Sequence, residues 1–392
     1  MHKYLEYIYG TSHMERKKIA IFSWESLYTD RVGGLANAAT YLAQELAKNH
    51  EVHFFTRGDR DFTFLGVHYH TVRPNGGNII EYCNNMSHQM VSRMKEFDHP
   101  AFDILHFNDW HVIEALHLLQ DRNTIFTYHS TEYGRNGNQH GDWWEYREIS
   151  GKEWYAGLIA KQVTTVSHVL RNEVMHLYNV PDWKIKVFPN GVIPEQFDVS
   201  LEQGEIKQQM GIHPYAPTIF FVGRMAYQKG PDLLIDALSK VKESHWGMHV
   251  IMAGDGGMRQ WLEHTAHSRG LNVRFPGYIS DAEYVRHLHA ADLVVIPSRN
   301  EPFGIVLPEA WSAGKAVIAC DVGGLSENIE SHRDGIKVPV SSEHLGNGIS
   351  EALKEPEHLN RFGRMGRAKV YREFHWEGIA RRIDGMYQSI AS

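Results

Sequence analysis

Short apolar runs alternate with amphipathic segments along the chain from Lys18 onward. Such alternation is typical of parallel sheets covered by helices on both faces. In the first half, the apolar runs predict strands at residues 19–23, 51–56, 103–107, 124–129, 163–167 and 185–189. Between the first two runs, apolar residues recur at helical spacing, at Leu35, Ala38, Ala39, Leu42 and Leu46. This segment therefore predicts one βαβ unit.

The same alternation restarts in the second half, after a polar and turn-rich stretch at residues 202–217 that we interpret as an interdomain connection. Strands are predicted at residues 218–223, 248–254, 273–277, 292–298, 316–321 and 335–338. Helices are predicted to begin at Pro231, Met258, Asp281, Val306 and Leu325. We therefore expect an α/β protein of two Rossmann-like, doubly wound domains, with ligands bound beyond the carboxyl ends of the strands in a cleft between them.

Length and composition narrow the class of protein. A chain of 392 residues exceeds what one hydrophobic core usually serves, and we predict an N-terminal arm at 1–16, a first domain at 17–195 and a second at 196–375. Only two cysteines, Cys83 and Cys320, are present, which favours a reducing cytoplasm. No apolar run has the length of a membrane span, and a net charge of -7 gives no general reason to expect nucleic acid as a partner.

Two carboxylates, Glu301 and Glu309, have seven residues between them at a predicted strand-to-helix junction. Backbone amides at such a junction suit phosphates, and the carboxylates can accept hydrogen bonds from a sugar hydroxyl and a ribose hydroxyl. The alternative is an ordinary pair, one acid in a solvated loop and one near a helix N-terminus. Taken alone, the spacing does not decide between them.

Two cations lie five positions apart in the loop that follows the first predicted strand of the second domain. Gly223 precedes Arg224, and Lys229 precedes another glycine. Arginine offers a planar fork and lysine a mobile point charge, and both suit a diphosphate leaving group that gains negative charge. A solvated basic loop is the alternative interpretation.

Paired glycines, Gly33 and Gly34, join the first strand to the following helix. They allow backbone amides to approach a phosphate or sugar at a helix N-terminus, although a bare turn has the same sequence. Neither this loop nor residues 254–257 match the G-x-G-x-x-G fingerprint, so a nicotinamide-dependent dehydrogenase is disfavoured.

Polar and aromatic residues follow two further predicted strands, at 106–111 and 127–132. His129 ends its strand and is the better functional candidate, whereas His106 lies within an apolar strand and is predicted to be structural. Many histidines raise the question of zinc, but neither a His-x-x-x-His pair on a convincing helix nor a cysteine pair is seen, so no metal site is predicted.

As an ordered set, these motifs resemble the retaining glycosyltransferases of family four and the related bacterial and archaeal glycogen synthases, which share the GT-B fold. The markers are residues 33–35, 108–111, His129, 189–191, 223–224, 229–230, Glu301, Glu309 and 323–324. Residues 374–380 resemble the start of the terminal helix that crosses back to the first domain in this fold, here 376–392.

The resemblance implies a role for each matched residue. Arg224 and Lys229 would bind the donor diphosphate, Glu309 the ribose and Glu301 the sugar hydroxyls. Backbone groups would assist the donor at Gly223, Phe303, Gly304, Ile305 and Val306. His129 and Asn190 would contact the donor sugar near its sixth carbon, and Gly33 and Gly34 would admit the diphosphate or the acceptor. Asp109, His111 and Glu132 are expected on the acceptor side.

Several alternatives stay open at this point. Asp59 and Asp61 match the D-x-D pattern of metal-dependent glycosyltransferases, but they lie in a polar turn. Glu301 as a covalent nucleophile is a minor mechanistic alternative to attack on the face of the leaving group. A phosphorylase would need pyridoxal phosphate, for which no lysine motif is recognised, and a non-catalytic glycan-binding protein on the same scaffold is a different class.

The resulting prediction is a cytoplasmic, retaining hexosyltransferase that uses a nucleoside diphosphate sugar, UDP-glucose or ADP-glucose first, and an α-glucan or related carbohydrate acceptor. Transfer from another donor such as GDP-mannose to a small or lipid-linked acceptor is the alternative. No cofactor, metal, nucleic acid partner or integral membrane association is expected, and the oligomeric state is left open.

Overall fold

The computed structural model describes residues 15–198, 202–245 and 247–391, so nearly all of the predicted N-terminal arm lies outside the described residues. Contacts between residues divide the chain into two compact units. Of the described residues, the first unit comprises 15–127, 155–163 and 380–391, and the second comprises 128–154, 164–198, 202–245 and 247–379. The domain boundaries expected from the sequence remain predictions.

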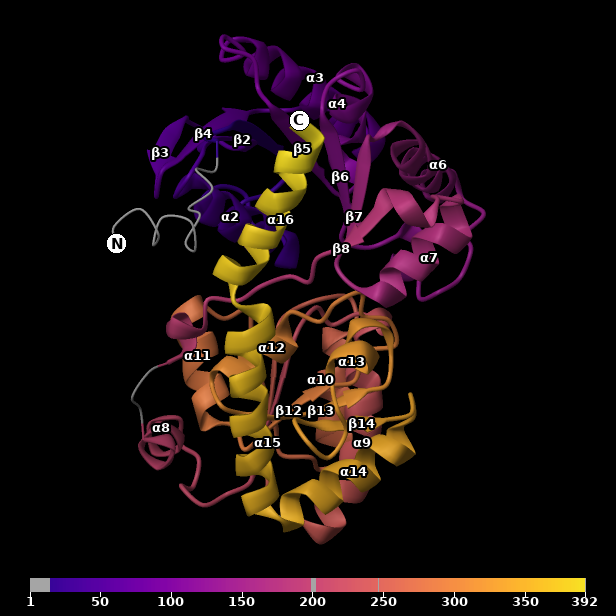
Figure 1. Cartoon of the computed structure of the whole chain (residues 1–392). Coiled ribbons are helices and arrows are strands. Elements are labelled where there is room, and N and C mark those ends of the chain that lie inside the picture. The colour runs from indigo at the N-terminus through magenta and orange to yellow at the C-terminus, as the bar shows by residue number, and fades with distance from the viewer. Residues whose placement is uncertain (1–14, 199–201, 246, 392) are drawn as a thin grey trace, which may run out of the picture. The chain divides into compact units, whose positions relative to one another are not determined.

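The first sheet has eight strands in the order β3-β4-β2-β1-β5-β6-β7-β8 (Figure 1). Its strands are β1 Lys18–Phe22, β2 Glu51–Arg57, β3 Phe62–Phe64, β4 Val67–Val72, β5 Ile104–Asn108, β6 Thr124–Tyr128, β7 Gln162–Thr165 and β8 Ile185–Val187. Strand β1 is parallel to both β2 and β5, and the Phe22 ring lies 5.1 Å from Phe55 and 4.6 Å from Phe107. This aromatic row forms the centre of the core of the first unit.

The strand pair β3 and β4 is missing from the sequence-based prediction. Strand β4 pairs in parallel with β2, and β3 pairs with β4 in antiparallel fashion through a turn at Leu65 and Gly66, both with positive φ. Strand β4 contains His68 and His70, polar residues that mask its apolar alternation. His70 is nevertheless buried, because its ring stacks on Phe97 and its Nε2 lies 2.8 Å from Nδ1 of His53.

Helices flank the first sheet. Their bounds are α2 Gly34–Ala47, α3 Ile79–Lys95, α4 Ile113–Leu118, α5 Glu132–Arg135, α6 Trp144–Ile159 and α7 His168–Tyr178, with 3-10 turns at Trp110–Val112, Asp182–Lys184 and Pro194–Phe197. The last turns of α16 (Trp376–Ala391) also belong to the first unit. There Tyr387 donates or accepts a 2.6 Å hydrogen bond with His106 of β5, and Asp384 lies 3.1 Å from His50.

The second sheet has six strands in the order β11-β10-β9-β12-β13-β14, and the recorded pairings are all parallel. Its strands are β9 Thr218–Val222, β10 His249–Ala253, β11 Val273–Gly277, β12 Leu293–Ile296, β13 Ala316–Cys320 and β14 Ile336–Val338. All six lie where the sequence predicts them, within two residues at each end. The strand order reverses between β9 and β12, which is the position where doubly wound sheets bind ligands.

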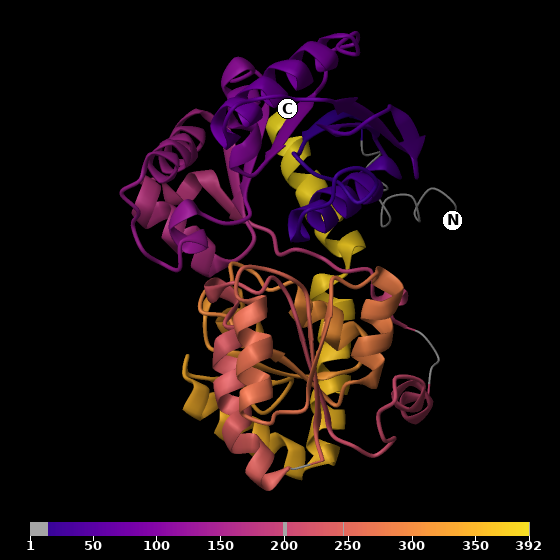
Figure 2. The same cartoon turned by 180° about the vertical axis from the view of Figure 1, so that it is seen from behind.

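Helices cover both faces of the second sheet (Figures 1 and 2). They are α8 Gln203–Gln209, α9 Pro231–Ser244, α10 Arg259–Ser268, α11 Asp281–Ala290, α12 Val306–Ser312, α13 Gly323–Asn328, α14 Ser342–Lys354 and α15 Pro356–Lys369, followed by a π-helical turn Val370–Phe374. Ile219 and Phe221 of β9 join a core with α9, α10 and α14, whereas the Phe220 ring lies 6.1 Å from Tyr284 on α11. Successive side chains of β9 therefore pack against the helix layers on opposite faces of the sheet.

Helix α8 forms within the stretch that the sequence analysis interprets as a polar connection. Lys207 is buried there, with Nζ 2.7 Å from Asp292 and 2.9 Å from the carbonyl oxygen of Ala216. A lysine that is paired in this way can occupy an interior position that composition alone assigns to solvent. Among the described residues, no helix has the length and apolar character needed to cross a membrane.

Candidate active site

Three loops at the carboxyl ends of neighbouring strands of the second sheet form the candidate site. They are residues 223–230 after β9, 297–305 after β12 and 321–324 after β13. The first two loops flank the reversal in strand order. All three belong to the second unit, so their arrangement is fixed by one compact body.

Glycines allow these loops to touch. A Cβ at Gly230, where φ is +65°, would lie 2.0 Å from the carbonyl oxygen of Pro297. A Cβ at Gly323, where φ is +51°, would lie 2.0 Å from the carbonyl oxygen of Glu301. Gly254 approaches the carbonyl oxygen of Gly223 in the same way. The loops that carry the candidate residues are therefore held by backbone contacts that no other residue type permits.

Lys229 and Glu301 form an ion pair across the strand reversal. The Lys229 Nζ lies 2.6 Å from Oε2 of Glu301, and Ser298 donates a hydrogen bond of 3.1 Å to the same oxygen. Glu301 is buried, so these two partners offset the cost of its charge. The pair brings together two residues that the sequence analysis selects from motifs 72 positions apart.

Arg224 is the exposed cation of the site. Its guanidinium donates a 3.1 Å hydrogen bond to the side-chain oxygen of Gln228, and the Gln228 amide lies 3.4 Å from the side-chain oxygen of Asn300. Gln228 is buried, and it links the loop after β9 to the loop after β12. This chain of amides orients the guanidinium while leaving it accessible to a ligand.

A second arginine braces the same two loops. Arg299 donates two hydrogen bonds, of 2.8 and 2.6 Å, to the carboxylate of Asp232 at the start of α9. Its guanidinium also lies 3.9 Å from the centre of the Tyr227 ring. Bidentate pairing of this kind is geometrically specific, so Arg299 fixes the loop that carries Lys229.

Glu309 lies on α12 and points toward α11. Tyr284 donates a 2.7 Å hydrogen bond to its Oε2, and both side chains are buried or partly buried. Burial and the neighbouring carboxylate raise the pKa of Tyr284 well above its usual value, so the phenol stays a hydrogen-bond donor. Tyr284 thereby fixes the orientation of the Glu309 carboxylate.

Backbone N–H groups are available beside these carboxylates. No described residue accepts a hydrogen bond from the N–H groups of Gly304, Ile305 or Val306, which precede and open α12. The carbonyl oxygen of Gly304 accepts from Leu307 at 2.9 Å, which fixes the turn. The site thus combines two cations on the loop after β9 with Glu301 and amide donors on the loop after β12, and Glu309 on the adjoining helix α12.

Three other predicted residues lie on different segments of the second unit. His129 follows β6, and burial lowers its pKa to about 3, so its ring is neutral near pH 7. Glu132 begins α5, where its carboxylate accepts a 2.9 Å hydrogen bond from Arg135. Asn190 precedes Gly191, at which a Cβ would lie 2.6 Å from the Trp376 ring. Their roles toward a donor or an acceptor remain predictions.

The glycine pair of the first unit has a different environment from the one expected. The N–H of Gly33 donates a 2.8 Å hydrogen bond to Oε2 of Glu25, and the N–H of Val32 donates to the same oxygen. Glu25 is buried, and burial raises its pKa although these two N–H donors oppose the change. A carboxylate of the chain therefore occupies the position that the sequence analysis assigns to an approaching anion, beside Gly34 at the start of α2.

Asp109 and His111 belong to an aromatic stack of the first unit. Asp109 adopts a φ of +64° and accepts a 2.9 Å hydrogen bond from the Trp110 N–H. The His111 ring lies between Trp24 at 3.9 Å and Trp110 at 4.2 Å, measured between ring centres. The stack positions both residues at the carboxyl end of β5, and their expected acceptor role is untested.

The D-x-D candidate is used within the fold. Asp61 accepts a 2.9 Å hydrogen bond from the Thr71 N–H and pairs with Arg93, while Asp59 lies 2.9 Å from Arg73. Burial acts to raise the pKa of Asp61, but the Thr71 N–H and Arg93 outweigh it and lower the pKa. Among the described residues, no three histidine, cysteine or acidic side chains gather as a metal site would need.

Sequence reasoning missed the residues that hold the others in place. Tyr284 acts on Glu309, 25 positions away, and Gln228 and Asn300 meet across 72 positions, whereas Ser298 contacts the nearby Glu301. None of the four is predicted from the sequence as a functional residue. Glu25 is likewise recognisable only after the loop at Val32 has folded back on it. A spacing pattern carries no signal for such contacts.

The fold and the site together define a nucleotide-sugar-dependent glycosyltransferase of the GT-B class. The model of the Glycosyltransferase Family 4 matches residues 32–196, and that of the Glycosyl transferases group 1 matches residues 202–369. The chain is also 33% identical over 386 residues to an uncharacterized glycosyltransferase of Methanocaldococcus jannaschii, covering 95% of this chain and 98% of that protein. The chain therefore belongs to glycosyltransferase family 4.

Comparisons with proteins of lower sequence identity agree with this assignment. The chain is 26% identical over 327 residues to a glycogen synthase of Mycobacterium tuberculosis, covering 80% of this chain and 76% of that protein. Sucrose-phosphate synthase from Thermosynechococcus elongatus has the same fold, with a TM-score of 0.82, 22% identity and coverage of 96% and 99%. Starch synthase IV from Arabidopsis thaliana, solved with ADP and acarbose, matches with a TM-score of 0.79 and 16% identity. The match covers 96% of this chain and 100% of that chain. These comparisons confirm the expected family and GT-B fold.

Proposed function

We propose that this glycosyltransferase transfers a hexosyl group, glucose first among the candidates, from UDP- or ADP-glucose to an α-glucan or a related carbohydrate acceptor. The observation that carries the proposal is the joint position of Arg224, Lys229 and Glu301 beside unpaired backbone N–H groups at the strand reversal. The similarity to a glycogen synthase and the ADP in the starch synthase structure support the choice of donor and acceptor.

In this proposal the diphosphate of the donor lies between the exposed Arg224 and Lys229. Bond cleavage at the sugar leaves negative charge on the diphosphate, and both cations and the amides of residues 304–306 stabilise that charge where it develops. Removal of one such donor typically costs about 10²–10³-fold in kcat. Gln228 and Arg299 serve as positioning residues for the two cations.

The carboxylates bind rather than react in the mechanism that we favour. Glu301 already accepts hydrogen bonds from Lys229 and Ser298, and its remaining acceptor capacity suits a sugar hydroxyl. Glu309, held by Tyr284, is proposed to accept from the ribose. Retention of configuration then follows from attack on the face that the diphosphate leaves, with a donor phosphate oxygen removing the acceptor proton.

The test is a panel of UDP-, ADP- and GDP-sugars, screened first by thermal shift and then by release of the nucleoside diphosphate with maltooligosaccharide acceptors. Binding of the matching donor to the native state raises the melting temperature by mass action. The anomeric configuration of the product, read by NMR, decides retention. If a donor binds but no nucleoside diphosphate is released with any acceptor, a glycan-binding protein on this scaffold would be favoured.

A transferase with a small acceptor is the second candidate. The structural similarity to sucrose-phosphate synthase from Thermosynechococcus elongatus supports this second candidate, because the alignment of the two structures covers 96% of this chain. Sugar phosphates and GDP-mannose therefore belong in the same panel.

We also propose a cytoplasmic location, because both cysteines are buried free thiols.

A further inference from the structure

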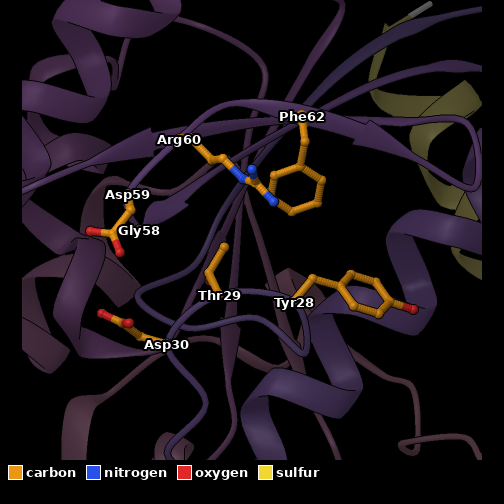
Figure 3. A pocket seen from close by; sticks show the side chains of 7 residues that line it. All are labelled: Tyr28, Thr29, Asp30, Gly58, Asp59, Arg60 and Phe62. Atoms are coloured by element: carbon orange, nitrogen blue, oxygen red, sulfur yellow. The ribbon is translucent and has the colours of Figure 1, made fainter.

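A pocket in the first unit lies outside every loop discussed so far as the donor site. It has a volume of about 360 Å³ and is lined by Tyr28, Thr29, Asp30, Gly58, Asp59, Arg60 and Phe62 (Figure 3). Its residues come from the loop after β1, from the segment that joins β2 to β3, and from Phe62 at the start of β3. Since β1 and β2 are adjacent parallel strands, the pocket opens beyond their carboxyl ends, where α/β sheets bind ligands.

We propose that this pocket binds a neutral hexose unit of a carbohydrate, and so is a glycan subsite of the enzyme. The inference rests on the proposed function, because it assigns part of the carbohydrate acceptor to a defined place. Its volume lies near the lower end of the range of about 300–1,000 Å³ that is usual for small-molecule sites. One or two sugar rings suit that size, whereas a long polymer would extend beyond it.

The polar groups of the pocket match hydroxyls. Figure 3 shows Asp30 and Asp59 at one end of the pocket, with the side chains of Arg60 and Phe62 on another side. Carboxylates only accept hydrogen bonds and a guanidinium only donates them, whereas a hydroxyl does both. A ligand with several hydroxyls can therefore satisfy all three side chains at once.

Charge argues against an anionic ligand or a metal ion. The lining contains two carboxylates and one guanidinium, and a phosphate would meet both Asp30 and Asp59. Those carboxylates have partners outside the lining, since Asp30 lies 3.9 Å from Arg57 and Asp59 lies 2.9 Å from Arg73. Counted with these partners, two carboxylates face three guanidiniums, a formal charge of +1, so no large excess of either sign surrounds the pocket, which suits a neutral polyhydroxylated ligand.

An aromatic side chain, Tyr28, lies on the side of the pocket away from the two carboxylates and is held in place (Figure 3). The Tyr28 hydroxyl accepts a 2.7 Å hydrogen bond from Gln44 on α2, and the Tyr28 ring makes edge contacts with Phe64 at 4.8 Å and Tyr69 at 5.9 Å. Tyr28 is nevertheless 39% exposed and Phe64 46% exposed. Fixed and exposed rings suit the apolar C–H face of a sugar, because little side-chain entropy is lost on binding.

The close approach of the two loops depends on Gly58. A Cβ at this position would lie 2.8 Å from a methyl carbon of Thr71 and 3.2 Å from that of Thr29, which itself lines the pocket. The N–H of Gly58 donates a 3.1 Å hydrogen bond to the carbonyl oxygen of Val72. The two loops thus approach each other through a contact at Gly58 that a side chain would obstruct.

The experiment measures oligosaccharide affinity of the full chain by ligand-observed NMR and titration calorimetry, with maltoheptaose, cellopentaose and mannopentaose as probes. The variant carries Asp30→Ala and Asp59→Ala, both at exposed positions, and Asp121→Ala is the control at an exposed position of the same unit outside the pocket. We expect the double variant to bind its best oligosaccharide at least about ten-fold more weakly, which corresponds to about 1.4 kcal/mol, and the control to match the unmodified protein.

UDP and ADP affinities are measured on the same samples, and they should not change in the double variant. If nucleotides fail to bind while the aspartates still control oligosaccharide affinity, the proposed donor fails and the pocket stands. If nucleotides bind but no probe sugar does, or if the double variant binds sugars as the control does, the pocket assignment is overturned. Binding of glucose 6-phosphate in preference to every neutral probe would also overturn it.

Discussion

Lys229 Nζ and Glu301 Oε2 lie 2.6 Å apart and connect the loops on either side of the strand reversal in the second sheet. The two charges face each other in the structure, although they are proposed to bind different parts of the donor. A diphosphate that approaches Lys229 therefore meets a lysine whose position is already set by a buried carboxylate. Positioning before binding lowers the entropy cost of organising the site.

Replacing Lys229 with methionine is expected to lower kcat by about 10²–10³-fold, since the leaving diphosphate loses one cation. Glu301→Gln should also lower kcat/KM, and the double variant should lose less than the sum of the two, because residues in contact are energetically coupled. The measurement is the initial rate of nucleoside diphosphate release over a range of donor concentrations up to saturation, which gives kcat and kcat/KM.

Lys240→Met is the matched control for this cycle, because Lys240 lies on α9 in the same unit and forms only an exposed pair with Glu343 at 3.7 Å. It should retain full activity. Unchanged kcat and unchanged kcat/KM after Glu301→Gln would exclude both a nucleophilic and a binding role for that carboxylate.

Tyr284→Phe removes the donor of the 2.7 Å hydrogen bond to Glu309 and keeps the ring that packs near Phe197 and Phe220. We expect the KM for the donor to rise about ten-fold, with kcat little changed, since ribose binding is the same in the ground state and in the transition state. The assay compares a donor with its 2′-deoxyribose analogue. In the variant the analogue should lose less affinity than it does in the unmodified enzyme, and Tyr215→Phe, at a position that is 90% exposed, should behave as the unmodified enzyme does.

Sequence patterns predict the fold of this protein well, because parallel strands that are buried on both faces have short, nearly continuous apolar sequences. Strands β9, β10, β12 and β13 of the second sheet follow that pattern, and so does β1, whereas the edge strands β11 and β14 alternate between apolar and polar residues. The pair β3 and β4 escapes it, since His68 and His70 interrupt the apolar pattern of β4, although His70 is buried and stacks on Phe97.

For the candidate site, the sequence supplies the charged residues but not their supports. Arg224, Lys229, Glu301 and Glu309 stand in recognisable motifs next to strand ends. Tyr284 and Gln228 act only through three-dimensional neighbours, and Glu25 shows that a loop amide can already have a partner within the chain. Such contacts depend on side chains meeting across the fold, which no local spacing encodes.

Gly323→Ala is expected to destabilise the second unit strongly. The residue has a φ of +51°, and its new Cβ would lie 2.0 Å from the carbonyl oxygen of Glu301. Gly211→Ala is the matched control, because its φ is +71° but no atom lies within 4 Å of a Cβ there. Both variants bear the left-handed backbone cost of about 1–2 kcal/mol, so the difference between them isolates the collision.

We expect Gly323→Ala to lose about 2 kcal/mol more than Gly211→Ala in urea unfolding, and to lose activity as the Glu301 loop shifts. Gly385→Ala provides a further comparison, since it lies in the middle of α16 with open space around it. That variant should gain about 0.5–1 kcal/mol from helix propensity. Equal losses at positions 323 and 211 would show that the loop yields without cost.

His129 should make stability depend on pH in a defined direction. Burial lowers its pKa in the folded state to about 3, against an unperturbed value of about 6.5. Between these values the unfolded chain binds a proton that the folded protein excludes, so acid favours unfolding, and the stability held above pH 6.5 is lost as the pH falls toward 3. At pH 5 the loss of folding free energy from this one side chain is about 2 kcal/mol.

His129→Gln should therefore lose less stability than the unmodified protein between pH 7 and pH 5, measured by urea unfolding at both values. His213→Gln, at a histidine in the turn that follows α8, should leave the difference unchanged, and an NMR titration in which the His129 ring takes up a proton near pH 6.5 would contradict the assignment.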